Sequence, residues 1–163
     1  MIKDYSNLFN NKINIFLTQV DKYWDEKYPY SRKEKIKNYL KLKDQKIIIP
    51  KQIHGDLVIH VSDKTENLEC DSIIFNSDDI IGSINVADCV PICIYDTDRE
   101  IISLVHSGWK GTAKKIVIKT IQELQKMGSN KRSFRFFLGP SIKSCCYEVE
   151  DSFALQFDSI AVR

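Results

Sequence analysis

Residues 90–106, with the sequence VPICIYDTDREIISLVH, decide the fold that we predict for this chain. Two apolar runs rich in β-branched residues, 90–95 and 101–106, flank the turn-forming residues Asp96-Thr97-Asp98. Strands that lie this close in sequence are joined more often by a hairpin than by a crossover. The segment therefore predicts an antiparallel hairpin within a sheet.

Further strands are predicted on both sides of this hairpin. Each is a short apolar run bounded by turn residues, and together they comprise residues 12–18, 46–49, 57–61, 72–75, 80–86 and 134–138. Because several of these runs follow one another closely, we expect neighbouring strands to be mostly antiparallel.

Two helices are predicted at the flanks of the strand-rich region. Ser31 and Glu34 have capping-box spacing at the start of a helix over 31–43. A second helical pattern begins at Thr112, the expected N-cap, and ends at Gly128, where a C-terminal cap belongs. Strands in the middle with helices at both ends predict an α/β sandwich with a mixed sheet.

Length, composition and charge exclude several classes of protein. A chain of 163 residues buries roughly 70% of its unfolded surface on folding, which is enough for one domain. With 43% hydrophobic and 28% charged residues, it is neither a disordered tail, a collagen-like fibre nor a coiled coil. A net charge of +2, with lysines spread along the chain, argues against nucleic-acid binding.

The sequence also gives an expectation for the compartment. No apolar run approaches the ~20 residues of a membrane span. The first residues are polar and lack the apolar core of a signal peptide. We therefore expect a cytoplasmic protein with no membrane partner, in which the five cysteines are thiols, metal ligands or a nucleophile rather than a disulfide framework.

Three residues at the ends of predicted strands are candidates for chemistry: His54, Cys89 and His106. Two imidazoles and a thiolate suffice for a zinc site with one open position. The alternatives are a thiol nucleophile with a histidine base, a buried cysteine that acts as a small hydrophobe, and two ordinary hydrogen-bonded histidines. The spacing of these residues is not a local metal motif, so it leaves the choice open.

The segment after His106 carries a second signal. Gly108 and Gly111 flank Trp109 and Lys110 at a predicted strand-to-helix turn. Small residues there would let a ligand approach the backbone, and a lysine at a helix start suits an anion. A plain tight turn is the alternative.

The other thiols carry weaker predictions. We expect Cys93 to pack in the core and Cys70 to be a loop thiol. Cys145 and Cys146 are adjacent, and disulfide geometry makes a bond between them unfavourable.

Five short motifs occur in order along residues 31–157 and are specific as a set. They are Gln52-Ile53-His54-Gly55, Ala87-Asp88-Cys89-Val90-Pro91, His106-Ser107-Gly108-Trp109-Lys110-Gly111, Leu138-Gly139-Pro140-Ser141-Ile142 and Cys145-Cys146-Tyr147-Glu148-Val149. Together they resemble the family known as multicopper polyphenol oxidase or laccase-domain proteins. The same family is also known as purine nucleoside phosphorylases and as a peptidoglycan-editing factor.

The resemblance implies a fold, a metal and a reaction. The implied fold is a layered α-β-β-α sandwich with a mixed, largely antiparallel sheet. The implied metal ligands are His54, Cys89 and His106, which are the residues that chemistry alone had selected. The implied substrates are purine nucleosides and phosphate, through phosphorolysis of adenosine, inosine, guanosine or methylthioadenosine and deamination of adenosine.

Zinc is expected at this site rather than copper. A blue-copper site takes two histidines, a cysteine and a weak axial methionine. This chain has methionine only at positions 1 and 127, and only three histidines for a multicopper centre. The resemblance is thus to a laccase-domain family, but the composition disfavours laccase chemistry.

Three further residues complete the predicted site. Asp88 is the nearest carboxylate for proton transfer, with a strand-end hydrogen bond as the alternative. Arg32 resembles an arginine at the start of the corresponding family helix and would bind phosphate. Lys110 stands where the family commonly has arginine, which keeps the charge but loses the bidentate fork.

Two departures from the family pattern shape the remaining hypotheses. The family usually has Phe-x-Thr-Arg followed by Gly-Gly-Val-Ser, whereas residues 16–19 read FLTQ with no glycine pair after them. The family also continues beyond the point where this chain stops, so residues 1–163 are expected to form a single, incomplete domain. The alternatives to a purine nucleoside enzyme are a peptidoglycan-precursor editing hydrolase, a copper-dependent phenol oxidase and a truncated, inactive relative. The sequence predicts no oligomeric state.

Overall fold

The computed structural model describes residues 2–18, 32–62, 64–150, 153 and 157. The chain divides into two compact units, Met1–Ile47 and Ile48–Arg163. The first contains β1 (Ile2–Asp4), the short 3-10 helix η1 (Ser6–Phe9), β2 (Phe16–Thr18) and α1 (Arg32–Leu40). β1 and β2 pair antiparallel. β3 (Lys46–Ile48) leads into the second unit.

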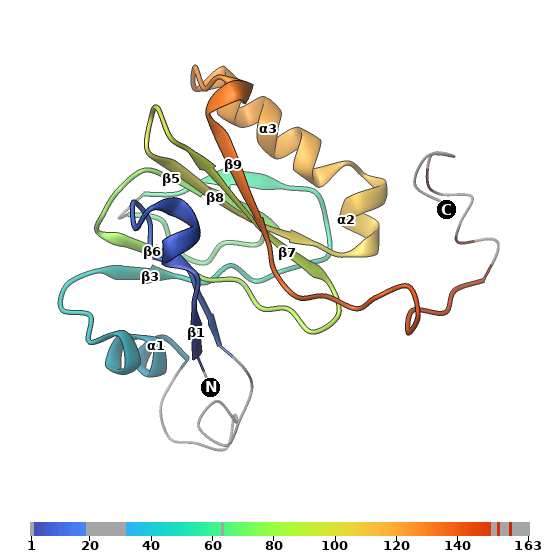
Figure 1. Cartoon of the computed structure of the whole chain (residues 1–163), viewed down its shortest axis with the longest axis horizontal. Helices are drawn as coiled ribbons and strands as arrows, with labels where there is room; N and C mark the ends of the chain where they lie inside the picture. The colour runs from blue at the N-terminus through green and yellow to red at the C-terminus, as the bar shows by residue number, and fades with distance from the viewer. Residues whose placement is uncertain (1, 19–31, 63, 151–152, 154–156, 158–163) are drawn as a thin grey trace. The chain divides into compact units, whose positions relative to one another are not determined.

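The second unit is built on a five-stranded sheet (Figure 1). Its elements are β4 (Val58–His60), β5 (Ser72–Phe75), β6 (Ile80–Gly82), β7 (Val90–Asp96), β8 (Ile101–Ser107), α2 (Trp109–Ala113), α3 (Ile116–Lys126), η2 (Lys131–Ser133) and β9 (Phe134–Leu138). The strand order is β4-β5-β8-β7-β9, and only the β4–β5 pair is parallel. The predicted α/β class with a mixed, largely antiparallel sheet is therefore confirmed, and the α-β-β-α layering stays a prediction.

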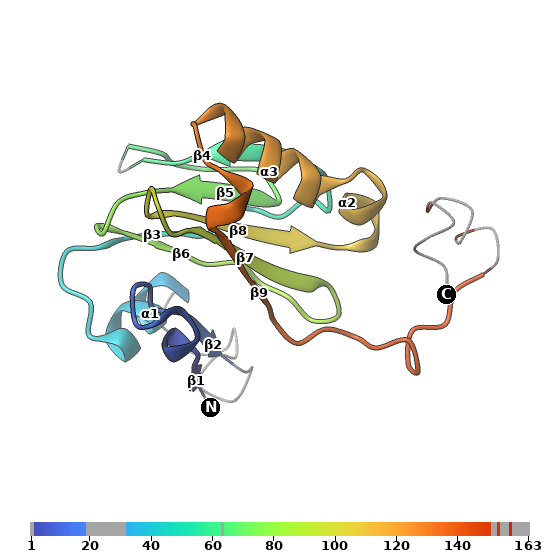
Figure 2. The same cartoon turned by 45° about the horizontal axis from the view of Figure 1, so that its top comes forward.

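The hairpin of β7 and β8 lies in the middle of this sheet and carries its core. Alternate side chains of the strands point to opposite faces, because a strand has a period of two. One face is covered by α3 (Figure 2), where the buried cluster is Ile74, Ile92, Ile94, Ile101, Val105, Ile116, Leu124 and Phe134. The other face carries the cluster Ile48, Val61, Cys70, Ile73, Phe75 and Ile80. Ile102 and Leu104 of β8 pack against this second cluster, so the hairpin contributes to both faces of the sheet.

A polar contact also joins α3 to the sheet. The hydroxyls of Ser72 on β5 and Thr120 on α3 lie 2.9 Å apart, and both residues are fully buried. Hydrogen bonding offsets the cost of burying these polar groups. The contact fixes α3 against the strand that follows Asp71.

Several local predictions are corrected by the structure. β4 and β5 follow one another closely in sequence but pair parallel, against the expectation of antiparallel neighbours. The helix after β8 begins at Trp109, so Thr112 lies inside α2, and its hydroxyl donates to the Gly108 carbonyl oxygen at 2.9 Å.

The same helical segment is divided in two. The left-handed backbone of Lys115, with φ of 62°, separates α2 from α3. Gly128 follows α3 with φ of 89°, as a C-terminal glycine should, and this prediction is confirmed. The predicted helix over 31–43 is present as α1, which ends earlier at Leu40, and its expected cap Ser31 lies outside the described residues.

Among the residues that the structure describes, no helix combines the length and the hydropathy that crossing a bilayer requires.

Candidate metal centre

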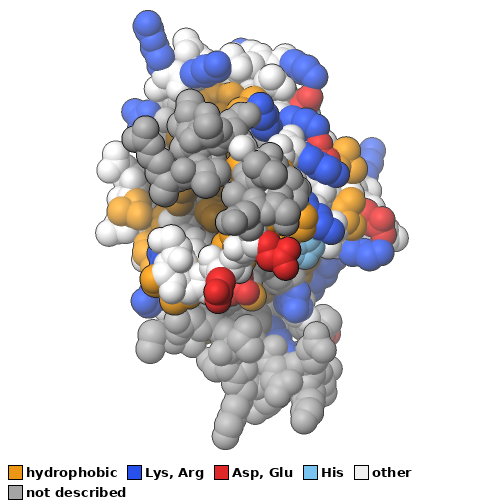
Figure 3. Space-filling view, turned by 90° about the vertical axis from the view of Figure 1, so that its right-hand side faces the viewer, with side chains coloured by type: hydrophobic (Ala, Val, Ile, Leu, Met, Phe, Trp, Pro, Cys, Tyr) orange, Lys and Arg blue, Asp and Glu red, His pale blue; other side chains and the backbone are white. Residues whose placement is uncertain are grey.

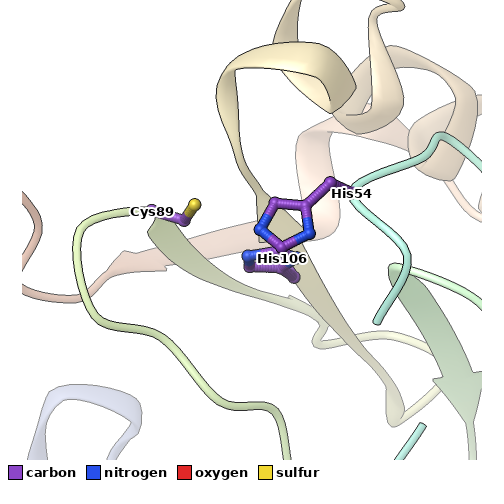
Figure 4. A group of neighbouring side chains, drawn as sticks. All are labelled: His54, Cys89 and His106. Carbon is purple, nitrogen blue, oxygen red and sulfur yellow. The ribbon is translucent and has the colours of Figure 1, made fainter. Parts of the chain in front are cut away.

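Three segments bring the predicted trio together at one end of the sheet. His54 lies in the loop after β3, Cys89 directly precedes β7, and His106 is the penultimate residue of β8. Pairing of Pro91 with His106 and of Val90 with Ser107 sets the start of β7 beside the end of β8. The side chains of His54, Cys89 and His106 point toward one another (Figure 4), with their donor atoms within 4.8 Å of one another.

The three donors differ in exposure. His106 is buried at 2% relative exposure, Cys89 is half-buried and His54 is exposed. The two imidazole rings meet edge to face, with centroids 4.8 Å apart. On the face shown in Figure 3, a histidine side chain reaches the surface beside acidic and hydrophobic side chains. Because the His54 side chain is exposed, a ligand can approach the group from solvent on the His54 side.

Asp71, which sequence reasoning missed, holds two of these segments in place. Its carboxylate lies 2.7 Å from Nδ1 of His106 and accepts hydrogen bonds from the amides of Ile53, His54 and Gly55 at 3.2, 3.0 and 2.7 Å. The residue is fully buried directly before β5. The available signal was an acidic residue directly before the apolar run SIIF, since a buried charge is rarely placed without a partner.

The electrostatics of Asp71 favour its ionised form. Burial raises the pKa of this carboxyl, but hydrogen bonds from the His106 ring and from the Gly55 and Ile53 amides outweigh it and hold the pKa below its usual value. Asp71 is thus a buried carboxylate whose charge is stabilised by its hydrogen-bond donors.

The Cys89 thiol shows the opposite shift. Burial, followed by the negative charges of Asp88 and Asp71, raises its pKa above the ordinary value. A thiol nucleophile needs a depressed pKa, so the environment of Cys89 disfavours the metal-free nucleophile that the sequence left open. A bound cation reverses this logic, because a coordinating thiol is deprotonated.

Two glycines make room for this arrangement. A Cβ on Gly108 would lie 3.0 Å from Sγ of Cys89, 3.3 Å from Cδ2 of His54 and 3.8 Å from Cε1 of His106. A Cβ on Gly111 would lie 2.8 Å from the Gly55 carbonyl oxygen. The glycines of the His-Ser-Gly-Trp-Lys-Gly motif therefore allow the His54 loop and the donors to approach the start of α2.

The donor set fits zinc. Two donors of one tetrahedral zinc ion, bonded at ~2.0–2.3 Å, lie ~3.3–3.8 Å apart, so a trio whose donor atoms lie within 4.8 Å of one another needs only a small side-chain adjustment to hold the ion. Two imidazoles and one thiolate leave a fourth position open for water or substrate. A blue-copper site would require a methionine. Met127, the one methionine among the residues that the structure describes, packs against the core cluster beside α3.

The structure places the remaining predicted residues as follows. Asp88 is exposed next to Cys89, and its backbone carbonyl accepts from the Ile142 amide at 3.0 Å. Lys110 is exposed in the first turn of α2, with Nζ 5.4 Å from the Trp109 ring centroid. Arg32 begins α1 in the first unit, so its predicted role beside the trio stays a prediction.

The other cysteines lie outside the trio. Cys93 is buried on β7 at 3% exposure, as predicted, and Cys70 lies in a loop, as predicted, but is fully buried. Cys145 and Cys146 are exposed free thiols with their sulfurs 3.3 Å apart.

Comparison with known protein families identifies the family of this chain. The family described as multi-copper polyphenol oxidoreductase laccase matches residues 23–162, which include all three donors. The chain belongs to this family. It is similar to a purine nucleoside phosphorylase of Clostridium acetobutylicum, with 34% identity over 128 residues that make up 78% of this chain and 53% of that protein. A purine nucleoside phosphorylase of Borreliella burgdorferi is 39% identical over 112 residues, 68% of this chain and 49% of that protein.

A further relative and two solved structures extend the comparison. A protein named adenosine deaminase, from an unknown prokaryotic organism, is 28% identical over 115 residues, 64% of this chain and 44% of its own length. The hypothetical protein YfiH of Bacillus licheniformis matches with a TM-score of 0.70 and 29% identity over 75% of this chain and 50% of that one. YlmD of Geobacillus stearothermophilus shares the fold, with a TM-score of 0.69 and 22% identity over 76% of this chain and 50% of that one. The chain spans about half the length of the curated relatives it matches.

Proposed function

We propose that this chain carries the zinc site of an enzyme that acts on purine nucleosides. His54, Cys89 and His106 are the proposed ligands, and the convergence of their donor atoms within 4.8 Å is the observation that carries the proposal. Relatives named purine nucleoside phosphorylase and adenosine deaminase support the substrate class. The three-donor set supports a site that keeps one position open for chemistry.

The chain's own residues supply distinct parts of the proposed reaction. A bound zinc ion supplies Lewis-acid polarisation of water or substrate. The contact between Nδ1 of His106 and Asp71 orients the imidazole ring, which leaves Nε2 to face the other two proposed ligands. Asp88 is exposed beside Cys89, where a carboxylate can accept or return a proton.

Phosphorolysis additionally requires a positively charged side chain that binds the phosphate. In that reaction a phosphate oxygen bonds to C1′ of the ribose while the bond from C1′ to the base breaks, and the base leaves with a proton. Lys110, exposed at the start of α2 two residues after Gly108, is the proposed phosphate contact. Deamination instead replaces the 6-amino group of adenosine with oxygen from water and releases ammonia, so it does not require this cation.

The test is conversion of adenosine by the purified, zinc-loaded chain. With phosphate present we expect adenine and ribose 1-phosphate, inosine, or both, separated by chromatography. Cys89→Ala is the matched inactive variant, and Cys145→Ser, which removes an exposed thiol that is not one of the trio, serves as the control. A folded chain with zinc bound that forms none of these products would contradict the proposal.

A further inference from the structure

We propose that Asp71 is the positioning residue of the metal centre and sets the geometry of two ligands, His54 and His106, at once. This inference rests on the proposed metal site but concerns a residue that coordinates nothing itself. Asp71 is fully buried directly before β5, whereas the ligands come from three other segments. One carboxylate therefore couples parts of the chain that are far apart in sequence.

The first arm of this arrangement runs to His106. Oδ1 of Asp71 lies 2.7 Å from Nδ1 of the imidazole, and the His106 amide donates to the Asp71 carbonyl oxygen at 2.7 Å. A carboxylate can only accept, so the ring presents its proton on Nδ1 and leaves the Nε2 lone pair for a metal. The hydrogen bond between the two backbones also fixes the position of His106. Both the orientation of the ring and its tautomer therefore follow from Asp71.

The second arm runs to the His54 loop. Three consecutive amides, of Ile53, His54 and Gly55, donate to the same carboxylate at 3.2, 3.0 and 2.7 Å. His54 has φ of 55°, a left-handed conformation that is uncommon outside glycine. Such a conformation persists only when its surroundings hold it. The Asp71 carboxylate supplies that restraint, and it keeps the exposed His54 ring directed at the trio.

A comparable carboxylate elsewhere in the sheet provides a control that distinguishes positioning of metal ligands from structural support alone. Asp96, at the far end of β7 from Cys89, is also fully buried. It accepts hydrogen bonds from the Ser133 hydroxyl at 2.6 Å and from the Asp98 and Arg99 amides at 3.0 and 3.4 Å. Asp71→Asn and Asp96→Asn thus make the same chemical change in two similar buried networks, and only the first contacts metal ligands.

The experiment measures zinc affinity by competition with a chromophoric chelator for wild type, Asp71→Asn and Asp96→Asn, with unfolding curves for each. We expect Asp71→Asn to lose about 10–100-fold in zinc affinity, which is typical for loss of an outer partner of a metal-bound histidine. Asp96→Asn should lose stability but bind zinc like wild type. A folded Asp71→Asn chain with wild-type zinc affinity would overturn the inference.

A measurement on the wild-type protein tests the inference even if the Asp71→Asn chain does not fold. Nitrogen-15 NMR of the histidine side chains reports which ring nitrogen carries the proton in the zinc-loaded chain. We expect Nδ1–H and zinc on Nε2 for His106, and the reverse assignment would overturn the inference. A wild-type chain that binds no zinc would overturn the proposed metal site itself, and the two failures are therefore distinguishable.

Discussion

The substitution Gly108→Ala tests how closely the three donors are packed. Gly108 has an extended backbone, with φ of −75° and ψ of 171°, which alanine adopts without strain. The effect of the added methyl group is therefore purely steric. It would meet Sγ of Cys89 at 3.0 Å and Cδ2 of His54 at 3.3 Å.

The size of the effect follows from these contacts. Heavy atoms pack best at about 3.5–4.0 Å, so the methyl group pushes the Cys89 sulfur by roughly half an ångström or more. A metal site tolerates ligand displacements of only about 0.2 Å. We expect zinc affinity to fall by about 10–100-fold. The metal-free chain should lose only about 1 kcal/mol, the low end for added methylene groups, since Cys89 is half-buried and can turn outward.

The assay is chelator competition for zinc affinity, combined with urea unfolding of the metal-free chain. Gly55→Ala is the matched control, because its Cβ would meet Ile53 at 3.4 Å and Asp71 Oδ2 at 3.5 Å, which are ordinary contacts. We expect this variant to bind zinc like wild type. Wild-type zinc affinity in Gly108→Ala would show that the zinc-bound donors do not converge beside Gly108.

Three other predictions concern the pH dependence, the core and the exposed thiols. Although burial raises the pKa of Asp71, its hydrogen bonds lower it below the unfolded value of about 3.9. Its stabilising effect is therefore present above that pH and lost as the pH falls through the folded pKa, so the destabilisation by Asp71→Asn in metal-free chain should shrink in acid unfolding curves. Ile94→Ala, at a fully buried core position, should cost about 2–5 kcal/mol in urea unfolding, whereas the exposed Ile118→Ala should stay within about 0.5 kcal/mol; equal effects would contradict the described core. Replacing both Cys145 and Cys146 by serine should leave the zinc content measured by atomic absorption unchanged, and a loss of zinc would move the site to these thiols.

The convergence of His54, Cys89 and His106 could be anticipated from sequence because each residue lies at the end of an element. The ends of different strands can lie side by side at one edge of a sheet. His54, Cys89 and His106, which lie near predicted strand ends, were therefore plausible neighbours although they are far apart in sequence. The β7–β8 hairpin was also predictable, since its turn is local. Its register places Cys89 next to the end of β8 and thereby fixes two of the three donors.

Asp71 could not be assigned a role from sequence for a physical reason. Its partners are the backbone amides of residues 53–55 and a ring nitrogen of His106, and backbone donors leave no trace in residue identity. The parallel pairing of β4 with β5 was missed for a related reason. The relative direction in which two strands pair depends on the whole sheet and not only on their separation along the chain.

The error at Thr112 has a local cause. Threonine is a good N-cap, but the chain turns into helix immediately after β8, and Gly108 takes the capping position. Gly111 then lies inside α2, where its missing side chain lets Gly55 approach. This close approach between two backbones requires glycine inside the helix, and propensity alone does not report such contacts.

We propose that His54, Cys89 and His106 together hold one metal ion. Absorption spectra of the cobalt-loaded chain report on this directly, because a cysteine ligand gives thiolate-to-metal charge transfer and the visible bands report coordination number. We predict charge transfer and tetrahedral bands in wild type, and loss of charge transfer in a folded Cys89→Ala chain. Charge transfer that survives in Cys89→Ala, or bound cobalt without charge transfer in wild type, would contradict the account.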